Sequence, residues 1–490
     1  MDSSADIDEQ TPLLSPVSQT QREEKKDLPT GRSRVTPLPK VQMSTLMLLQ
    51  LAEPITSQCI YPFINQLITE LDITGGDERK VGYYAGMIQS LFFATEALFV
   101  LQWSMLSDRI GRKPVLLTGM AGLCISMICF GLSRTFRGLV ISRCLVGMLN
   151  GNTGVMKSMM SELTDSTNIA QAFALIPIVW SAGATVGPFM GGTLAKPHDR
   201  WPEVFSHPFW RQYPYFLPCA ASAAFSALIF IIVSIFLKET IPTKRKLVSE
   251  PESLTDFLPK SASECEPPTL RNVMIWPVII SVANYGLLAL FDIAWAAIQP
   301  LFYATPIEFG GLGMSPATIG VVLGVLGFSN GVFQGLFFAS FVRRWGLKKV
   351  FMTAMSAFMV IFSLFPVING VAKKAGGVTP LVWTLIAVQM FMVLVMDTAY
   401  GCIFLYIASA APSKRYLGAT NGLGQVVASI LRAVGPATST SLFAMSHEYN
   451  WLGGNAVFIV LVVASGLSLF ICNMLPKEQW PREEDRQDQY

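Results

Sequence analysis

Charged residues are scarce in this chain. Only 14% of its 490 residues are Asp, Glu, Lys or Arg, whereas 51% are apolar. Soluble domains carry about 25% charged residues, so the deficit points to lipid as the solvent. The basic residues stand between apolar runs and do not gather in one soluble basic domain, which argues against a nucleic-acid-binding protein.

Histidine is nearly absent, and the cysteines form no framework. The three histidines (His198, His207 and His447) fall in expected loops, where solvated side chains are a better interpretation than a metal site. Seven of the eight cysteines lie inside apolar runs, a pattern of neither disulfides nor zinc ligands. No catalytic His, Cys or Ser-based group gathers at one membrane face. We therefore expect no enzyme, no metal and no cofactor.

Long apolar runs are what the chain does contain. A membrane-spanning helix needs about 20 mostly apolar residues, and twelve runs meet this requirement. The sequence predicts an all-α integral membrane protein whose twelve transmembrane helices lie near 42–66, 82–103, 114–133, 138–160, 171–195, 213–237, 273–300, 317–341, 350–370, 380–409, 417–445 and 453–475.

A polar stretch divides these runs into two sets of six. We expect a cytoplasmic tail (1–40), a six-helix bundle (41–237), a cytoplasmic linker (238–272), a second six-helix bundle (273–476) and a short cytoplasmic tail (477–490). With the N-terminus inside, cytoplasmic segments hold 24 Lys and Arg and outer segments hold 9. This bias predicts that both termini are cytoplasmic. The segment 1–40 has no apolar core, so it is not a cleavable signal peptide.

The two halves echo each other, which is typical of transporters built from internal repeats. The run Asp108-Arg-Ile-Gly-Arg-Lys-Pro-Val follows the second helix, and Arg343-Arg-Trp-Gly-Leu-Lys-Lys-Val follows the eighth. In the first run, an acid and three bases flank a glycine turn at the cytoplasmic side. We expect Arg112 to reach Glu162, and Asp108 to face the N-terminus of a neighbouring helix. The predicted cytoplasmic gate motif comprises Asp108, Arg109, Gly111, Arg112, Lys113 and Glu162.

Two further motifs lie within helices. In the fifth helix, small residues near a proline predict close helix packing and a bend; the motif residues are Gly183, Gly187, Pro188, Gly191 and Gly192. In the fourth helix, a continuous helix would place polar residues within about 40° of one line, namely Arg143, Gly147, Asn150, Gly154, Lys157 and Ser161. This stripe is expected to line a central cavity.

Ionisable residues inside a membrane are candidates for function. A carboxylate isolated in a low-dielectric cavity favours its protonated form, so such an acid can carry a proton. The proton-coupling candidates are Glu53 first, Asp292 second, then Glu96 and Asp397, with Arg143 as the modulating base. The substrate-cavity candidates are Asn150, Lys157, Trp295, Gln299, Asn421, Gln425 and Arg432. For each ionisable residue, a structural ion pair is the alternative.

These motifs resemble the twelve-span drug:proton antiporter branch of the major facilitator superfamily, over about residues 41–476. The stretches Leu51-Ala-Glu-Pro54, Trp103–Pro114, Asn150-Gly-Asn152 and Glu162-Leu-Thr-Asp165 look like those of zinc-induced-facilitator-like proteins and their fungal relatives. That group tends to have serine where this chain has Ala174 and the plant members carry a cysteine-rich motif that this chain lacks, so the resemblance does not imply zinc. It does associate the fifth-helix motif with export and Arg143 with proton coupling.

The resemblance implies a monomeric secondary transporter that exports a small organic molecule by alternating access, with the lipid bilayer and protons as its other partners. Two interpretations remain open. One is an importer or vacuolar loader of a nutrient or metal complex, and the other is a non-transporting membrane sensor on the same scaffold. The plasma membrane is the expected location. The run Glu9-Gln-Thr-Pro-Leu-Leu14 resembles an acidic dileucine signal, which keeps the vacuolar membrane as an alternative.

Overall fold

The computed structural model describes residues 36–71, 73, 75, 77, 80–164, 168–240, 273–412, 417–478 and 480. Each of the twelve apolar runs coincides with one helix or with a pair of helices. The possible dileucine signal, most of the central linker and nearly all of the C-terminal tail lie outside the described residues.

The first half of the chain forms ten helices, eight of them in the six apolar runs. They are α1 (Lys40–Cys59), α2 (Ile64–Glu70), α3 (Val81–Ile110), α4 (Arg112–Gly131), α5 (Phe136–Leu149), α6 (Asn152–Glu162), α7 (Ile169–Leu194), α8 (Pro197–Arg200), α9 (Pro208–Gln212) and α10 (Phe216–Phe236). The short helices α8 and α9 lie in the loop between the fifth and sixth spans.

The last six runs form α12 (Trp276–Ala304), α13 (Pro316–Trp345), α14 (Leu347–Ala375), α15 (Pro380–Ala410), α16 (Leu417–Glu448) and α17 (Ala456–Asn473). Two 3-10 turns, η3 (Ile307–Phe309) and η5 (Trp451–Gly454), lie in their connections. Proline stands in the first turn of α12, α13 and α15. Backbone N–H groups of a first turn have no partner within the helix, so the N–H that proline lacks is not needed there.

Within the described residues, nine helices are long and apolar enough to cross a membrane. The three other apolar runs form α3 and the two interrupted spans α1–α2 and α5–α6. The prediction of an all-α integral membrane protein with twelve spans is confirmed.

The fourth span differs from its prediction, because it is broken at Asn150 and Gly151. Asn150 leaves the helix with φ −84° and ψ 75°. The Trp103 indole nitrogen donates to the Met148 carbonyl at 2.7 Å, and the ring fills the space where a side chain on Gly151 would stand. The single stripe predicted from 100° per residue is therefore wrong, since α5 and α6 are separate helices.

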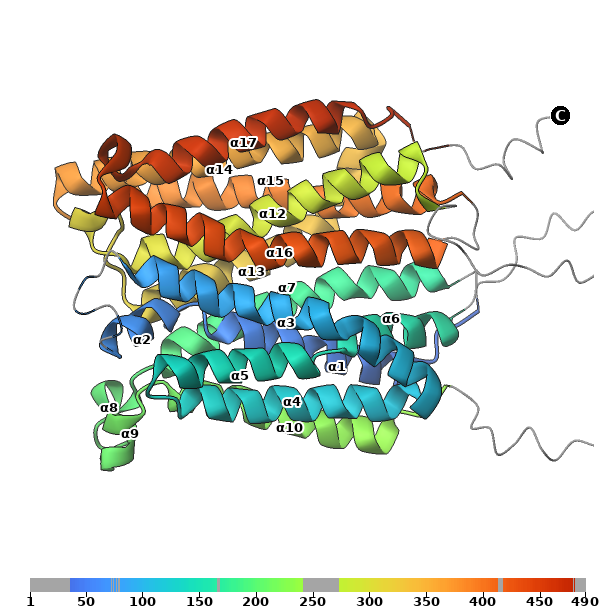
Figure 1. The fold of residues 1–490 in the computed structure, drawn as a ribbon, viewed down its shortest axis with the longest axis horizontal. Coiled ribbons are helices and arrows are strands. Elements are labelled where there is room, and N and C mark those ends of the chain that lie inside the picture. Colours follow the sequence, from blue (N-terminus) through green and yellow to red (C-terminus); the bar gives the residue numbers. More distant parts are fainter. Residues whose placement is uncertain are drawn as a thin grey trace, which may run out of the picture.

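The helices run side by side along the long axis, with those of the first six runs on one side and those of the last six on the other (Figure 1). We call the end of the bundle that holds α2, α8 and α9 the distal side, and the opposite end the terminal side. Across the boundary between the halves, α3 packs against α16 and α7 against α13. Gly82 and Gly86 meet Thr440 on the distal half of these helices, so the distal side is closed.

Candidate functional site

Glu53 lies in the interrupted first span, directly before Pro54 inside α1. The Thr153 hydroxyl of α6 donates to its carboxylate at 3.0 Å. The charges of Lys157 and Arg432 both act on this carboxylate, so residues from both halves of the chain surround it. The proton-coupling candidate Glu53 and the substrate-cavity candidates Lys157 and Arg432 therefore lie in one region.

A small cavity lies beside Glu53. Besides Glu53, its lining contains Thr56, Ser57, Phe92, Leu123, Met127, Arg143 and Val146. All of these lining residues belong to helices of the first half, and they include one acid and one base.

Arg143 is 9% exposed and stacks over the Phe130 ring, with its guanidinium carbon 5.0 Å from the ring centre. Among the described residues, nothing forms a hydrogen bond with its Nε. Tyr61, Cys59 and Cys219 are its electrostatic neighbours, whereas Glu53, Glu96 and Arg432 are those of Lys157. The break after α5 accordingly gives the two bases of the fourth span different surroundings.

Glu96 has a looser environment than Glu53. The Asn150 amide lies 3.5 Å from its carboxylate, at the limit of a hydrogen bond. Glu53, Lys157 and Arg432 are the charges that act on it. Two acids and two bases thus share the centre of the bundle, near the broken segment of the fourth span.

The second half holds a closed polar network around Asp292 of α12. The Tyr400 hydroxyl donates to Asp292 at 2.6 Å, and Arg432 donates to that hydroxyl at 3.3 Å. Tyr285 stacks edge-on against Tyr400 and donates to Gln425 at 3.4 Å. One hydroxyl therefore links an acid of α12 to a base of α16.

The other predicted residues of the second half lie in different settings. Asp397 is close enough to Asp292 for their charges to interact, and the Asn330 amide donates to it. Trp295 is 7% exposed, and its indole nitrogen has no partner among the described residues. Gln299 is 1% exposed and donates to Tyr303, so it lies inside the second half. Asn421 is exposed, four residues before Gln425 on α16.

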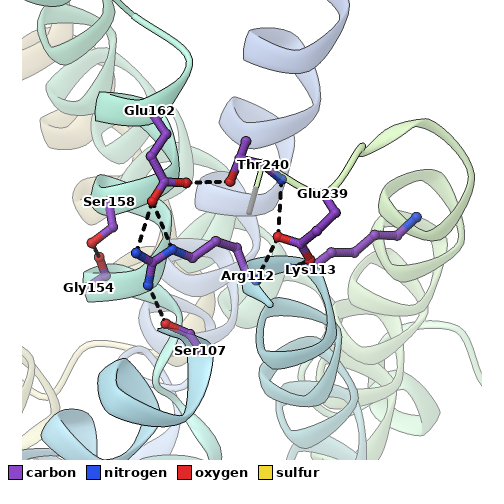
Figure 2. A network of polar contacts seen from close by, with 8 residues as sticks. All are labelled: Ser107, Arg112, Lys113, Gly154, Ser158, Glu162, Glu239 and Thr240. Carbon is purple, nitrogen blue, oxygen red and sulfur yellow. Dashed lines mark hydrogen bonds and ion pairs between the residues drawn. The ribbon is translucent and has the colours of Figure 1, made fainter. Parts of the chain in front are cut away.

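Three residues of the predicted gate motif, Arg112, Lys113 and Glu162, take part in a polar network (Figure 2). Arg112 donates to Glu162 through Nε at 3.2 Å and Nη2 at 2.9 Å, and to Ser107 through Nη1 at 2.5 Å. The predicted contact between Arg112 and Glu162 is confirmed. Arg109 is exposed, and the side chain of Asp108 lies outside what the structure describes.

Two residues of this network are missing from the sequence prediction. Glu239 accepts the backbone N–H groups of Arg112 at 2.9 Å and Lys113 at 3.0 Å, so it caps the N-terminus of α4. The Thr240 hydroxyl donates to Glu162. In Figure 2 the two residues enter from the chain segment after α10 and reach both partners of the ion pair. The only signal in the sequence is an acid just after the last apolar run of the first half.

The glycine motif of α7 packs on two faces. Gly183, Gly187 and Gly191 approach α1 between Pro54 and Cys59. On the other face, a Cβ on Gly192 would lie 2.9 Å from the Cα of Gly320 in α13, closer than real side chains come. The motif therefore allows close approach both within the first half and across the boundary between the halves.

Comparison with protein families identifies the architecture. The model of the Major Facilitator Superfamily matches residues 46–436. The chain is a member of this superfamily. It is thus a membrane transporter of small molecules and not an enzyme.

Several relatives span nearly the whole chain. It is 30% identical to the major facilitator-type transporter psiT2 of Psilocybe cyanescens, with 94% of this chain and 95% of that protein covered. It is 30% identical to the efflux pump azaK of Aspergillus niger (91% and 90% covered) and 29% identical to ZINC INDUCED FACILITATOR-LIKE 1 of Arabidopsis thaliana (88% and 90% covered). The predicted relation to zinc-induced-facilitator-like proteins and to fungal exporters is confirmed.

Solved structures share the fold. A bacterial homologue of the human lysosomal transporter Spinster, in an inward-facing unoccupied conformation, superposes with a TM-score of 0.65 at 14% identity, covering 90% of this chain and 98% of that one. The human organic anion transporter MFSD10 gives 0.59 at 17% identity, covering 89% and 100%.

Proposed function

We propose that this member of the superfamily is a proton-coupled exporter of a small organic molecule, which crosses the membrane by alternating access. The relatives named as an efflux pump, in Aspergillus niger, and as a multidrug transporter, in Aspergillus fumigatus, favour export. The acids and bases at the centre of the bundle support a coupled mechanism, because ionisable groups within a membrane mark ion and substrate pathways.

The surroundings of Glu53 carry the proposal. Its carboxylate accepts hydrogen bonds from Thr153 and Asn150, borders the cavity that contains Arg143, and lies within reach of the charges of Lys157 and Arg432. Each of these contacts changes in strength when Glu53 gains or loses a proton. Because α7 packs against α1 beside Glu53 and against α13 across the boundary, movement of the two bundles changes which side of the membrane supplies that proton.

The remaining central residues divide into two proposed roles. Asp292, Glu96 and Asp397 are secondary proton-coupling candidates, and Arg143 modulates Glu53. Asn150, Lys157, Gln425 and Arg432 contact the substrate, with Asn421 at the terminal end of the same α16 face. Trp295 and Gln299 shape the second half behind this surface. The residues 41–237 and 273–476 move as two bundles, and the 238–272 linker joins them.

We further propose that the terminal side is cytoplasmic and that the plasma membrane holds the protein. The excess of Lys and Arg in the segments on that side supports this orientation.

The first experiment profiles metabolites of cells and medium for the wild type and for Arg143→Ala, each with and without a protonophore. Compounds enriched in the medium only with the intact protein and an intact gradient would establish export and nominate a substrate. Compounds depleted from the medium would instead indicate uptake and overturn the proposed direction.

The second experiment uses the nominated compound in proteoliposomes. Glu53→Gln is expected to abolish transport driven by a pH gradient and to leave substrate exchange intact, because a neutral amide neither takes up nor releases a proton. Thr153→Val serves as the control, since it removes one hydrogen bond to Glu53 and keeps the carboxylate. Gradient-driven transport that survives in Glu53→Gln would overturn the assignment of Glu53.

A further inference from the structure

The loop between α7 and α10 contains an arginine that binds the end of a boundary helix. Arg200, the last residue of α8, donates from Nη1 to the Thr193 carbonyl at 2.6 Å and from Nη2 to the Gly192 carbonyl at 3.1 Å. Both carbonyls belong to the last turn of α7, whose C-terminal carbonyls have no partner within the helix. A cation there also complements the negative end of the helix dipole.

The same turn of α7 is one of the places where the two halves meet on the distal side. A Cβ on Gly192 would lie 2.9 Å from the Cα of Gly320 in α13, and a Cβ on Gly320 would lie equally close to the Cα of Gly192. The two helices touch backbone to backbone at this crossing. The orientation of the last turn of α7 therefore determines how closely the two helices approach at this crossing.

The last turn of α7 needs support from outside the helix. Pro188 lies inside α7, and its missing N–H and its ring weaken the helix where residues 189–194 begin. Beyond Leu194 the chain leaves the helix in an extended conformation at Ala195 and turns back with Lys196 in the left-handed region (φ 53°). The α8 segment thereby returns over the end of α7, which puts Arg200 against its carbonyls.

The loop itself is fastened to the first half. Lys196 forms an ion pair with Glu70 of α2 at 2.5 Å, and its N–H donates to the Pro214 carbonyl at 2.8 Å. The Tyr215 hydroxyl also donates to Glu70, at 2.9 Å. Burial, together with the Glu70 carboxylate, raises the pKa of Tyr215, so the hydroxyl remains a donor. Arg200 therefore connects the end of α7 to a loop anchored on α2 and α10.

We propose that Arg200 is a positioning residue for transport: it fixes the last turn of α7 in the orientation that seals against α13, and so favours the distal-closed state. The proposal rests on the alternating-access part of the proposed function and is independent of the substrate and of proton coupling. Without the Arg200 contact, residues 189–194 tilt about Pro188 and the crossing at Gly192 and Gly320 loosens.

The test measures the distal opening directly, in purified full-length protein in nanodiscs without substrate. Spin labels are attached through unnatural amino acids at Arg134 and Lys374, two exposed distal positions in opposite halves, so that the native cysteines stay. Distances between the labels are compared for the wild type, Arg200→Gln and Arg200→Lys. The matched control is Arg211→Gln, which removes an equal charge from the same loop but contacts His198 and not α7.

Arg200→Gln is expected to raise the ratio of distal-open to distal-closed molecules about tenfold, the effect of losing hydrogen bonds from a charged donor at a partly exposed site. Arg200→Lys should restore part of the wild-type ratio, because an ammonium still donates to a carbonyl. Arg211→Gln should match the wild type. Glu70→Gln, which weakens the loop anchor, should shift the ratio in the same direction by less.

Gly192→Ala provides the reference for an opened crossing, since its methyl group collides with α13. If Gly192→Ala opens the distal side and Arg200→Gln does not, the proposal for Arg200 is overturned and alternating access stands. If neither variant changes the distance between the labels, the proposal for Arg200 and the alternating-access mechanism are both overturned. Melting curves of each purified variant show that a shift reflects the crossing and not a loss of folded protein.

Discussion

The loops after the second and the eighth span occupy corresponding places in the two halves. They have similar backbone conformations but different charged contacts. Gly111 joins α3 to α4 with φ 105° and ψ 159°, and Gly346 joins α13 to α14 with φ 81° and ψ 155°. Both angles lie in a region that favours glycine. Two residues later, Lys113 donates to the Ser234 carbonyl at the end of α10, and Lys348 donates to the Asn473 carbonyl at the end of α17.

Among the residues that the structure describes, carboxylates contact the first loop and not the second. Glu239 caps the N-terminus of α4, and its Oε2 would lie 2.5 Å from a Cβ on Gly111, whereas a Cβ on Gly346 would meet nothing within 4 Å. Glu162 pairs with Arg112, while Arg343 of the second loop makes a 3.5 Å contact to Ser340. The repeat thus preserves the turn and the lysine contact, whereas the carboxylate network belongs to one half.

The largest expected difference between the loops comes from replacing their glycines. Gly346→Ala should lower stability by about 1–3 kcal/mol, the range for a strained backbone conformation. Gly111→Ala carries the same strain and also displaces Glu239 from α4, which adds about 1–3 kcal/mol for the lost hydrogen bonds. Thermal unfolding of both variants in detergent measures the difference. Equal losses of stability would show that Glu239 contributes nothing to the first loop.

The central acids provide the next comparison. Tyr400→Phe removes the hydroxyl that donates to Asp292 and accepts from Arg432. We therefore expect the free energy of unfolding to fall by about 2–3 kcal/mol. Thr153→Val removes one donor from Glu53 and should cost about 1 kcal/mol. Unfolding temperatures of the two variants test this order. A larger effect of Thr153→Val would mean that the first half, and not the second, contains the more tightly connected network.

A smaller contrast involves the loop arginines. Arg112→Lys loses the paired donors to Glu162 and the contact to Ser107. Because the Glu162 side chain is 32% exposed, solvent screens the pair, and we expect a loss of about 1 kcal/mol that shrinks in high salt. Arg343→Lys should be neutral at any salt concentration. Unfolding measured at two salt concentrations decides whether the ion pair or only its hydrogen bonds matter.

The sequence predicted the features that repeat locally. The twelve spans follow from apolar run length, and the contact of Arg112 with Glu162 follows from an ordered motif whose partner ends the fourth span. The break at Asn150 and Gly151 was not predictable from periodicity, which assumes an uninterrupted helix and ignores the packing of Trp103. This break separates the surroundings of Arg143 from those of Lys157.

Contacts between distant parts of the chain could not be predicted from the sequence either. Glu239 lies 127 residues from Arg112, and nothing near either residue specifies the other as its partner. Arg200 is closer in sequence to its partners in α7. Its contact with them still requires the chain to turn back over the end of α7, which depends on the left-handed conformation of Lys196, a conformation that lysine rarely adopts. Such contacts follow from tertiary packing and not from local pattern.

The smallest expected effect is the one shared by both loops. Lys113→Met and Lys348→Met keep most of the side-chain length and remove the ammonium that binds the carbonyls at the end of α10 and of α17. The free energy of unfolding should fall by about 0.3–1 kcal/mol in each variant, the usual contribution of a cation at a helix C-terminus. The two decreases should be equal within error. Unfolding of the single variants and of the double variant tests equality and additivity, since the two sites lie in different halves and share no partner. A loss at Lys113 several times that at Lys348 would mean that the neighbouring Glu239 strengthens the lysine contact of the first loop, so that even the shared part of the repeat has diverged.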